Sequence, residues 1–412
     1  MTGHYRDGRR RYALSRRAGT VTSHVSTPPR SRKELRQMAQ SSPTPLPRLP
    51  RSTTQGHQAR HLLAVPDDVV VDEVEVLALS RFGQTRWDVV PADLPGADLP
   101  AGRIAGPGEP GVLRLSRHSH VIGPYAPQGD GFELGVPGGT AMVFDVVTPR
   151  ERWDEPPYPG GGDRDGLARG FPRGLPNREE ERVVRWLVAA ARRLGGSVRL
   201  DVAGIFDPAE LARRGAGSGV VLTPDPGASV DLTVWSDIWL DPQAAHRVLQ
   251  AVHPRVVLAT QGADYQGPPA GIAEKPLYPG EKMDPDLRRE LHARADDYDI
   301  AALQAPVVLD GYGLTIDLGH DGFVTVEVNG EEVLPLLVKE LPWASNGAIC
   351  YRVVWDPPDL HEAQMEFPQP SLVVARKRAA DLVGKVAAAL HGAVGGEIAD
   401  EAEFLLAPED LG

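Results

Sequence analysis

The sequences GGSVRLDVAGIFDPAEL (residues 195–211) and GGEIADEAEFLLAPEDL (residues 395–411) indicate that this chain uses one structural unit twice. Four of the seventeen aligned positions are identical, and five more are close substitutions, such as Val198 for Ile398. An apolar-periodic helix is predicted before each Gly-Gly pair, and glycine readily takes the left-handed conformation that ends a helix. We therefore expect two helices that end at these glycines, each followed by a short strand.

The repeat extends upstream of these helices. Residues 141–147 (AMVFDVV) match residues 348–355 (AICYRVVW), and both stretches precede a proline-rich loop and the repeated helix. The second copy is seven residues shorter between strand and helix. The pattern predicts an α+β fold of two related domains produced by internal duplication, each a mainly antiparallel sheet with helices packed on one face.

Composition suggests the domain boundaries. Residues 1–65 are rich in Arg, Ser, Thr and Pro without periodicity, which predicts a disordered basic tail. Such a tail is a solvated segment, a basic arm for nucleic acid or membrane, or upstream sequence translated from a wrong start if Met38 is the true one. We expect the first domain over residues 66–260, a linker with a short helix over 261–300, and the second domain over 301–412.

Several local patterns predict individual elements. Residues 69–79 (VVVDEVEVLAL) and 111–122 (GVLRLSRHSHVI) are typical of strands, whereas 83–110 and 148–176 are typical of loops. Asn177 is predicted to cap a helix, with Glu180 completing a capping box. Asp241 and Pro242 predict the start of another helix. Residues 314–338 are expected to form a three-stranded meander.

Charge and cysteine content limit the partners and the compartment. Residues 1–65 hold 13 basic and 2 acidic residues, so the remaining chain holds 31 basic and 54 acidic residues, a net charge of −23. An acidic body repels nucleic acid and anionic membranes, so the charge serves either solubility alone or a protein partner with a basic or apolar surface. The single cysteine, Cys350, and the absence of a long apolar run or secretory signal favour the cytoplasm. The dominance of Arg over Lys is typical of GC-rich bacterial genes.

The repeated helix, Gly-Gly pair, strand and Pro-x-x-Leu ending resembles the end of split β-α-β, ferredoxin-like domains, such as the C-terminal domain of ZipA. The residues that carry this resemblance are Gly395, Gly396, Ile398, Pro408 and Leu411, with their counterparts after Gly195. It covers about 35 residues of each copy. The resemblance implies sheets that present one face to a partner, and it transfers no binding residues.

Two histidines are the metal candidates of the sequence. His118 and His120 are predicted on one face of a strand, a spacing that suits two metal ligands. No third ligand is identifiable, so we expect no metal and no cofactor. Two further histidines, His246 and His253, lie seven residues apart on a predicted helix, where they more often pack than bind. Cys350 lies in an alternating strand and is expected to be buried and inert.

Two stretches are candidates for binding loops. Residues 160–166 (GGGDRDG) place Asp163, Arg164 and Asp165 in a long loop, although they lack the full pattern of a calcium or phosphate loop. Trp235 and Trp239 belong either to an exposed aromatic anchor or to the core. No catalytic motif is recognisable, so no catalytic residues are assigned.

Two functional hypotheses follow from these observations. The first is a non-catalytic protein-binding module, either regulatory or similar to an immunity protein, which rests on the acidic charge and the repeat. The second is an enzyme or small-molecule-binding protein whose site lies in the cleft between the domains. Enzymatic activity stays open, and we favour its absence. A polar cleft lined by both domains supports the second hypothesis, and an exposed apolar patch supports the first.

Overall fold

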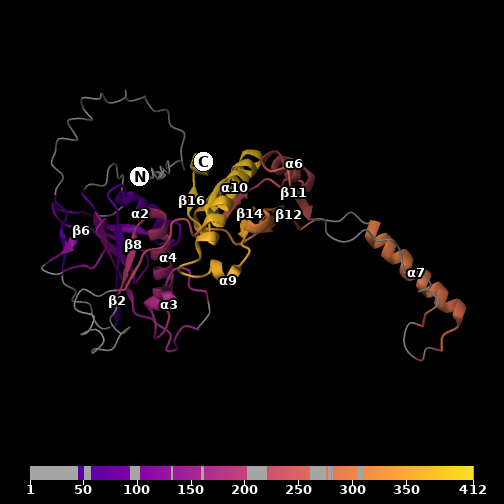
Figure 1. Cartoon of the computed structure of the whole chain (residues 1–412), viewed down its shortest axis with the longest axis horizontal. Helices are drawn as coiled ribbons and strands as arrows, with labels where there is room; N and C mark the ends of the chain where they lie inside the picture. Colours follow the sequence, from indigo (N-terminus) through magenta and orange to yellow (C-terminus); the bar gives the residue numbers. More distant parts are fainter. Residues whose placement is uncertain are drawn as a thin grey trace, which may run out of the picture.

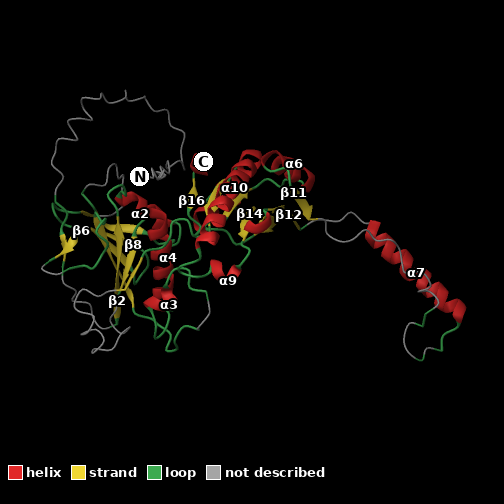
Figure 2. Cartoon of the chain, viewed as in Figure 1, coloured by secondary structure: helices red, strands yellow, loops and turns green. Residues whose placement is uncertain are grey.

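The computed structural model describes residues 45–50, 57–92, 103–130, 133–158, 162–201, 220–259, 275–276, 280, 282–304 and 310–411. Two α+β units lie side by side, and helix α7 (Pro285–Gln304) lies apart from both (Figures 1 and 2). The predicted disorder of residues 1–44 falls outside the described residues. The predicted α+β class with internal duplication is confirmed by the two units.

The first unit is a sheet whose strands follow the order β4-β3-β5-β6-β7-β2-β8-β9, with β1 beside β6. Its strands are β1 (Arg48–Leu49), β2 (Gln58–Val65), β3 (Arg86–Val90), β4 (Arg103–Ile104), β5 (Gly111–Arg114), β6 (His120–Gly129), β7 (Met142–Pro149), β8 (Ser197–Leu200) and β9 (Val220–Leu222). Its helices are α2 (Val71–Leu79), α3 (Leu167–Gly170) and α4 (Arg178–Leu194). Most neighbouring strands run antiparallel.

The second unit is a sheet of order β11-β12-β13-β14-β10-β15-β16. Its strands are β10 (Leu232–Ser236), β11 (Val256–Ala259), β12 (Gly311–Asp317), β13 (Phe323–Glu331), β14 (Ala348–Asp356), β15 (Glu397–Asp400) and β16 (Leu405–Leu406). Its helices are α6 (Pro242–Val252), α8 (Leu336–Lys339), α9 (Leu360–Ala363) and α10 (Pro370–Val394), with the short 3-10 turns η2 (Gly319–Asp321), η3 (Pro342–Ala344) and η4 (Pro408–Leu411). Helix α7 lies in the long connection between β11 and β12.

The two sheets have the same topology. In each unit the first long strand, β2 or β10, becomes central because it pairs with the last strand before the long helix and with the strand after it. The residues that meet across these three strands occupy the same places: Phe144, Leu63 and Val198 in the first unit, and Tyr351, Val234 and Ile398 in the second. Both segments of the predicted repeat therefore share one register.

The glycine pairs hold equivalent places at the ends of α4 and α10. Gly195 has φ 62° and Gly395 has φ 67°, and their N–H groups donate to the carbonyls of Ala191 and His391. These are conformations that L side chains rarely adopt, so glycine at the repeated position follows from backbone geometry. Both helices end at the predicted glycine with positive φ, but ψ is 28° at Gly195 and −153° at Gly395, so only Gly195 has the left-handed helical conformation.

The predicted tail contains a central strand. β2 lies within residues 58–65, and its Leu62, Leu63 and Ala64 are almost fully buried. The prediction of a tail that extends to residue 65 is therefore wrong in this part. The run of arginine and serine before β2 obscured a strand of only eight residues, because average composition hides a short apolar segment.

The boundary predicted at residue 260 also differs from the sheets. β10 and β11 were assigned to the first domain, yet both belong to the second sheet. β10 pairs with β14 and β15, which follow it by more than a hundred residues. Sequence proximity therefore misplaced them, because strand pairing is non-local and leaves little local signal.

Residues 71–79 form helix α2, so the strand predicted over 69–79 is wrong. Its valines have high strand propensity, but Val74, Leu77 and Ala78 are buried at helical spacing. The N–H of Val70 donates to Oε2 of Glu73 at 2.8 Å, which closes the first turn. Packing of this face against the sheet overrides the intrinsic preference of the valines.

Other local predictions need smaller corrections. The stretch 111–122 is a hairpin of β5 and β6 rather than one strand, and β3 and β4 lie in the region expected to be loop. Glu180 does not complete a capping box, because its side chain turns into the core. The third strand expected near residue 338 is helix α8, and β14 takes that place in the sheet. The helices at Asn177 and Asp241 are confirmed.

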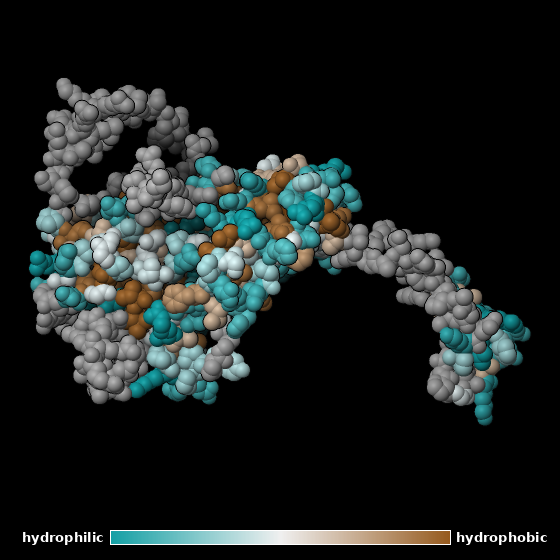
Figure 3. All heavy atoms as spheres, viewed as in Figure 1, coloured by the Kyte–Doolittle hydropathy of each residue, from teal (hydrophilic) through white to brown (hydrophobic). Residues whose placement is uncertain are grey.

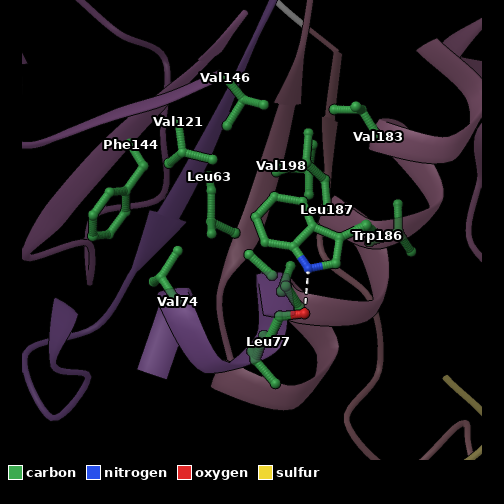
Figure 4. Packing of buried hydrophobic residues seen from close by; sticks show 14 of the residues in the cluster. Leu63, Val74, Leu77, Val121, Phe144, Val146, Val183, Trp186, Leu187 and Val198 are labelled. Carbon is green, nitrogen blue, oxygen red and sulfur yellow. Dashed lines mark hydrogen bonds between the residues drawn. The ribbon is translucent and has the colours of Figure 1, made fainter. Parts of the chain in front are cut away.

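Each unit buries one helical layer against one face of its sheet. In the first unit α2 and α4 supply Val74, Leu77, Trp186 and Leu187 to a core shared with β2 and its neighbours (Figure 4). The indole N–H of Trp186 donates to the carbonyl of Leu77 at 2.9 Å, so the largest buried side chain of this core also satisfies its polar group. In the second unit α6 and α10 form the corresponding layer.

Leu63→Ala should lower the free energy of unfolding by about 2–5 kcal/mol, because it removes a fully buried side chain from the central strand. Urea unfolding at neutral pH measures the change. Val333→Ala is the control, since Val333 is 85% exposed and should change stability by less than about 0.5 kcal/mol. Equal effects of the two variants would contradict the place of β2 in the core.

Candidate functional site

The two units meet along a seam that contains two cavities. The connector (residues 223–231) runs from β9 to β10 along this seam, and Val230 lines both cavities. The larger cavity has a volume of about 1140 Å³ and lies between α4, the connector and α10. The smaller cavity has a volume of about 540 Å³. Residues of both units line each cavity.

Four ion pairs between described residues of the two units share one polarity. The first unit supplies the arginine and the second unit supplies the carboxylate. The pairs are Arg81 with Glu403 at 2.6 Å, Arg164 with Glu401 at 2.9 Å, Arg169 with Glu366 at 2.6 Å, and Arg193 with Asp400 at 3.8 Å. Two of these contacts, at Arg164 and Arg169, use two guanidinium nitrogens each, which fixes orientation as well as distance.

A single aromatic side chain joins the two cores. Phe404 lies in the second unit between β15 and β16, yet it is buried in the core of the first unit. Asp400 shapes this turn, since its Oδ1 accepts the N–H groups of Ala402 and Phe404 at 2.9 Å. Burial of a whole phenylalanine ring is worth about 2–3 kcal/mol, so Phe404 contributes strongly to holding the seam closed.

The smaller cavity, here called the seam cavity, is the candidate site. One wall is the loop 162–167 of the first unit, and the opposite wall runs from Trp355 to Gln364 in the second. The N–H of Asp163 donates to the carbonyl of Gln364 at 2.8 Å and joins the two walls. The predicted binding-loop residues Asp163, Arg164 and Asp165 all line this cavity.

Most charged groups around the seam cavity have a partner. Asp163 accepts the N–H of Ala168 at 3.0 Å and caps α3, so its role is at least partly structural. Arg164 binds Glu401, as described above. Asp165 pairs with Arg192 and, at 3.9 Å, with Arg164, and Arg376 pairs with Asp225.

Asp231 differs from these groups. Its Oδ1 accepts the backbone N–H of Trp355 at 2.9 Å, and it forms no ion pair within the described part of the chain. Burial, together with the charges of Glu401 and Asp356, raises the pKa of Asp231 to about 6, although the Trp355 N–H and Arg164 oppose the rise. Burial likewise raises the pKa of Asp163 above its usual range. Asp163 and Asp231 are thus two carboxyl groups of the cavity that burial disfavours in their charged form and that have no ion pair among the described residues.

Asp231→Asn should stabilise the protein near pH 7, and this stabilisation should vanish near pH 4. The raised pKa of folded Asp231 means that ionisation lowers stability as the pH rises from about 3.8 through about 6. The amide oxygen of Asn keeps an acceptor for Trp355. Urea unfolding should show a gain on the order of 1 kcal/mol near pH 7. A gain that is independent of pH would contradict this assignment.

Large apolar side chains are exposed on the second unit, in a segment that begins within one wall of the seam cavity. Five of them are exposed within residues 360–374, which span α9 and the start of α10. They are Leu360, Met365, Phe367, Val373 and Val374. Phe367 is 83% exposed and Leu360 is 63% exposed, and Leu360 also lines the cavity. Brown apolar patches interrupt the hydrophilic surface of both units in Figure 3. We call the five residues the apolar rim.

The two candidate tryptophans do not line the seam cavity. Trp235 is 8% exposed and packs on the second face of its sheet with Val338 of α8. Trp239 is 38% exposed, and its ring meets the edge of Tyr312 at 5.4 Å between ring centres. The structure therefore divides this stretch between the core and the surface, and it separates both rings from Asp163, Arg164 and Asp165.

The other sequence candidates lie elsewhere. His118 is in the exposed turn after β5, and His120 is half-buried at the start of β6. Burial and the charge of Arg114 lower the pKa of His120. Among the described residues, no three His, Cys, Asp or Glu side chains gather as metal ligands would. Cys350 is buried, and burial raises the pKa of its thiol to about 11, which disfavours the thiolate. Nε2 of His246 lies 3.2 Å from the carbonyl of Val256.

Sequence reasoning missed a buried polar cluster in the first unit. His61 of β2 and Glu180 of α4 are both fully buried, with Nε2 of His61 3.4 Å from Oε1 of Glu180. Arg152 donates to the same oxygen at 2.9 Å, and the N–H of Glu151 donates to Oε2 at 2.7 Å. Burial alone raises the pKa of Glu180, but His61 and Arg152 together hold it below its usual range.

The duplication shows that this cluster is not needed for the fold. The register places Leu232 where the first unit has His61, and the aligned helices place Ala380 where it has Glu180. The second unit builds the same topology with these apolar residues. No seam cavity residue belongs to the cluster, so we assign it a structural role in fixing residues 150–152 against β2.

Glu180→Gln should lower the free energy of unfolding by about 3–5 kcal/mol at pH 7, because the mostly buried guanidinium group of Arg152 loses its carboxylate partner. The pKa of folded Glu180 is depressed, so its contribution is present above the unfolded value of about 4.5 and is lost as the pH falls through the folded value. Urea unfolding near pH 7 and near pH 3 measures this. Glu181→Gln, on the exposed face of α4, is the control and should cost less than about 0.5 kcal/mol.

Comparison of the chain with protein-family models, with curated proteins and with solved structures gives no match. The resemblance to split β-α-β domains therefore stays a prediction. No helix in the described part of the chain has both the length and the apolar character that crossing a membrane requires. Function is inferred from the chemistry of the seam.

Proposed function

We propose that this protein is a cytoplasmic, non-catalytic binding module that recognises another protein at the seam between its two units. The observation that carries this proposal is the apolar rim beside an acidic cavity. A regulatory or immunity-like role belongs to the same class of function. The partner presents an apolar surface with basic groups.

The apolar rim supports a protein partner. Its five side chains lie within fifteen residues of chain, and Phe367 is among the most exposed large apolar residues of the described part. A cluster of exposed large apolar residues in one segment is typical of an interaction site, and aromatic residues that become buried supply much of the binding energy in protein interfaces.

The charge of the seam cavity supports a basic partner. Four carboxyl groups line it, namely those of Asp163, Asp165, Asp231 and Glu401, against the guanidinium groups of Arg164 and Arg376. The excess of negative charge attracts cations and repels anions. This agrees with the acidic composition of the chain after residue 65.

A second candidate function is an enzyme or small-molecule-binding protein with its site in the seam cavity. The raised pKa of Asp231 is the specific observation that favours it, because a carboxyl group that titrates near neutral pH suits general acid or base catalysis. The apolar rim distinguishes the two functions. A small ligand held at Asp231 does not need Phe367, whereas a protein partner does.

Leu360→Ser with Phe367→Ser should abolish capture of a partner from a bacterial lysate by immobilised protein. Each change removes an exposed ring or branched chain, so folding should be unaffected and binding should fall by at least about tenfold. Quantitative mass spectrometry of bound proteins measures the loss relative to the wild type. Val333→Ser, an equally exposed change away from the rim, is the matched control.

Partners that are captured equally by the wild type and the double variant would contradict a role of the rim. Loss of the same partners in Val333→Ser would instead indicate nonspecific binding to exposed apolar residues. Circular dichroism melts of all three proteins should agree, which separates lost binding from lost folding.

A further inference from the structure

We propose that Asp231 is the receptor for one guanidinium group of the partner, and that a large apolar side chain next to this arginine packs on the apolar rim. This inference rests on the proposed function and deepens it, because it names the chemistry that the seam cavity recognises. The feature recognised on the partner is an exposed arginine next to a large apolar residue such as phenylalanine, and not a basic surface in general.

Asp231 is the carboxylate of the cavity with capacity for a new cation. Glu401 and Asp165 are engaged by Arg164 and Arg192, and Asp163 caps α3. Oδ1 of Asp231 accepts the Trp355 N–H, and its Oδ2 accepts no hydrogen bond from the described residues. A guanidinium group donates two parallel N–H groups that suit the two oxygens of a carboxylate. In Asp231, Oδ2 is free to accept and Oδ1 can accept a second hydrogen bond.

The position of Asp231 is rigid. It immediately precedes β10, which is paired on both sides, and its carboxyl group is held by the backbone of β14. β14 is the middle strand of the second sheet. A carboxylate fixed in this way needs little reorganisation on binding, which reduces the entropic cost of recognition.

The local charges favour a cation at this place. Glu401 and Asp356 lie close enough to affect the titration of Asp231, and the nearby Arg164 is already held by Glu401. A bound guanidinium neutralises Asp231 in a partly buried site, where charge interactions are stronger than in water. Because the cation favours the ionised carboxylate, binding should release a proton and strengthen as the pH rises from about 5 to about 7.5.

The apolar component follows from proximity. Leu360 belongs both to the cavity wall and to the apolar rim, and Gln364 of the wall directly precedes Met365 of the rim. An arginine side chain that enters the cavity therefore places the residue next to it over α9. This arrangement commits the cavity to a short protein segment, since a free metal ion or an anion would make no use of the rim.

Isothermal titration of the full chain with acetyl-Phe-Arg-amide and with acetyl-Phe-citrulline-amide tests the inference. The two dipeptides match in size, and only the first is charged. The wild type should bind the arginine dipeptide at least about tenfold more tightly near pH 7.5, and this preference should shrink severalfold near pH 5. Titrations in two buffers of different ionisation enthalpy should show proton release.

Asp231→Asn should remove the preference for the charged dipeptide and the release of a proton, while Glu332→Gln, an exposed change elsewhere in the second unit, should keep both. Equal binding of the two dipeptides to the wild type overturns the inference, and so does no binding of either up to about 10 mM. Loss of the preference in Glu332→Gln as well would assign it to overall charge and would also overturn it.

The proposed function and this inference fail separately. Lysate capture that depends on the rim, with no preference between the dipeptides, leaves the binding module intact and removes the role of Asp231. A preference for the arginine dipeptide without rim-dependent capture would support a cation-binding site at Asp231 and would contradict the protein-binding function.

Discussion

The insertion of Phe404 into the core of the other unit is the contact on which the candidate site depends. Without it, the described parts of the two units would be joined by the connector, by the hydrogen bond between Asp163 and Gln364, and by partly exposed ion pairs, which individually contribute about 0–1 kcal/mol. The buried ring fixes the distance between the units, and the ion pairs then fix their orientation. The seam cavity is the space that remains between two surfaces held in this way.

The two copies of the fold differ at a position that contributes an ion pair to the seam. The aligned positions Asp201 and Glu401 both follow the strand after the long helix. Asp201 binds Arg150 within its own unit at 2.9 Å, whereas Glu401 binds Arg164 of the other unit. One position of the repeat thus stabilises a unit in the first copy and joins the units in the second, which is how a duplicated fold acquires an internal interface without a new element.

The candidate site was only partly predictable. A long glycine-rich loop with alternating charges pointed to Asp163, Arg164 and Asp165, because loops of this length often carry sites. Asp231 gave no signal, since a lone carboxylate before a strand is ordinary, and only burial by distant residues makes it unusual. Trp235 and Trp239 attracted interest through residue type alone, and the pleat of β10 places the first ring in the core.

Local sequence determined the helix ends and the duplication, because a cap at Asn177 or a glycine at residue 195 or 395 acts through backbone geometry within one turn. It also determined the alternation of β13, whose buried face follows a period of two. Only the tertiary structure decided that β2 is central rather than part of a tail, that β10 belongs to the second sheet, and that Asp231 faces a cavity. Each of these depends on hydrogen bonds or burial between residues far apart in the chain, and such contacts leave no periodic trace in the sequence.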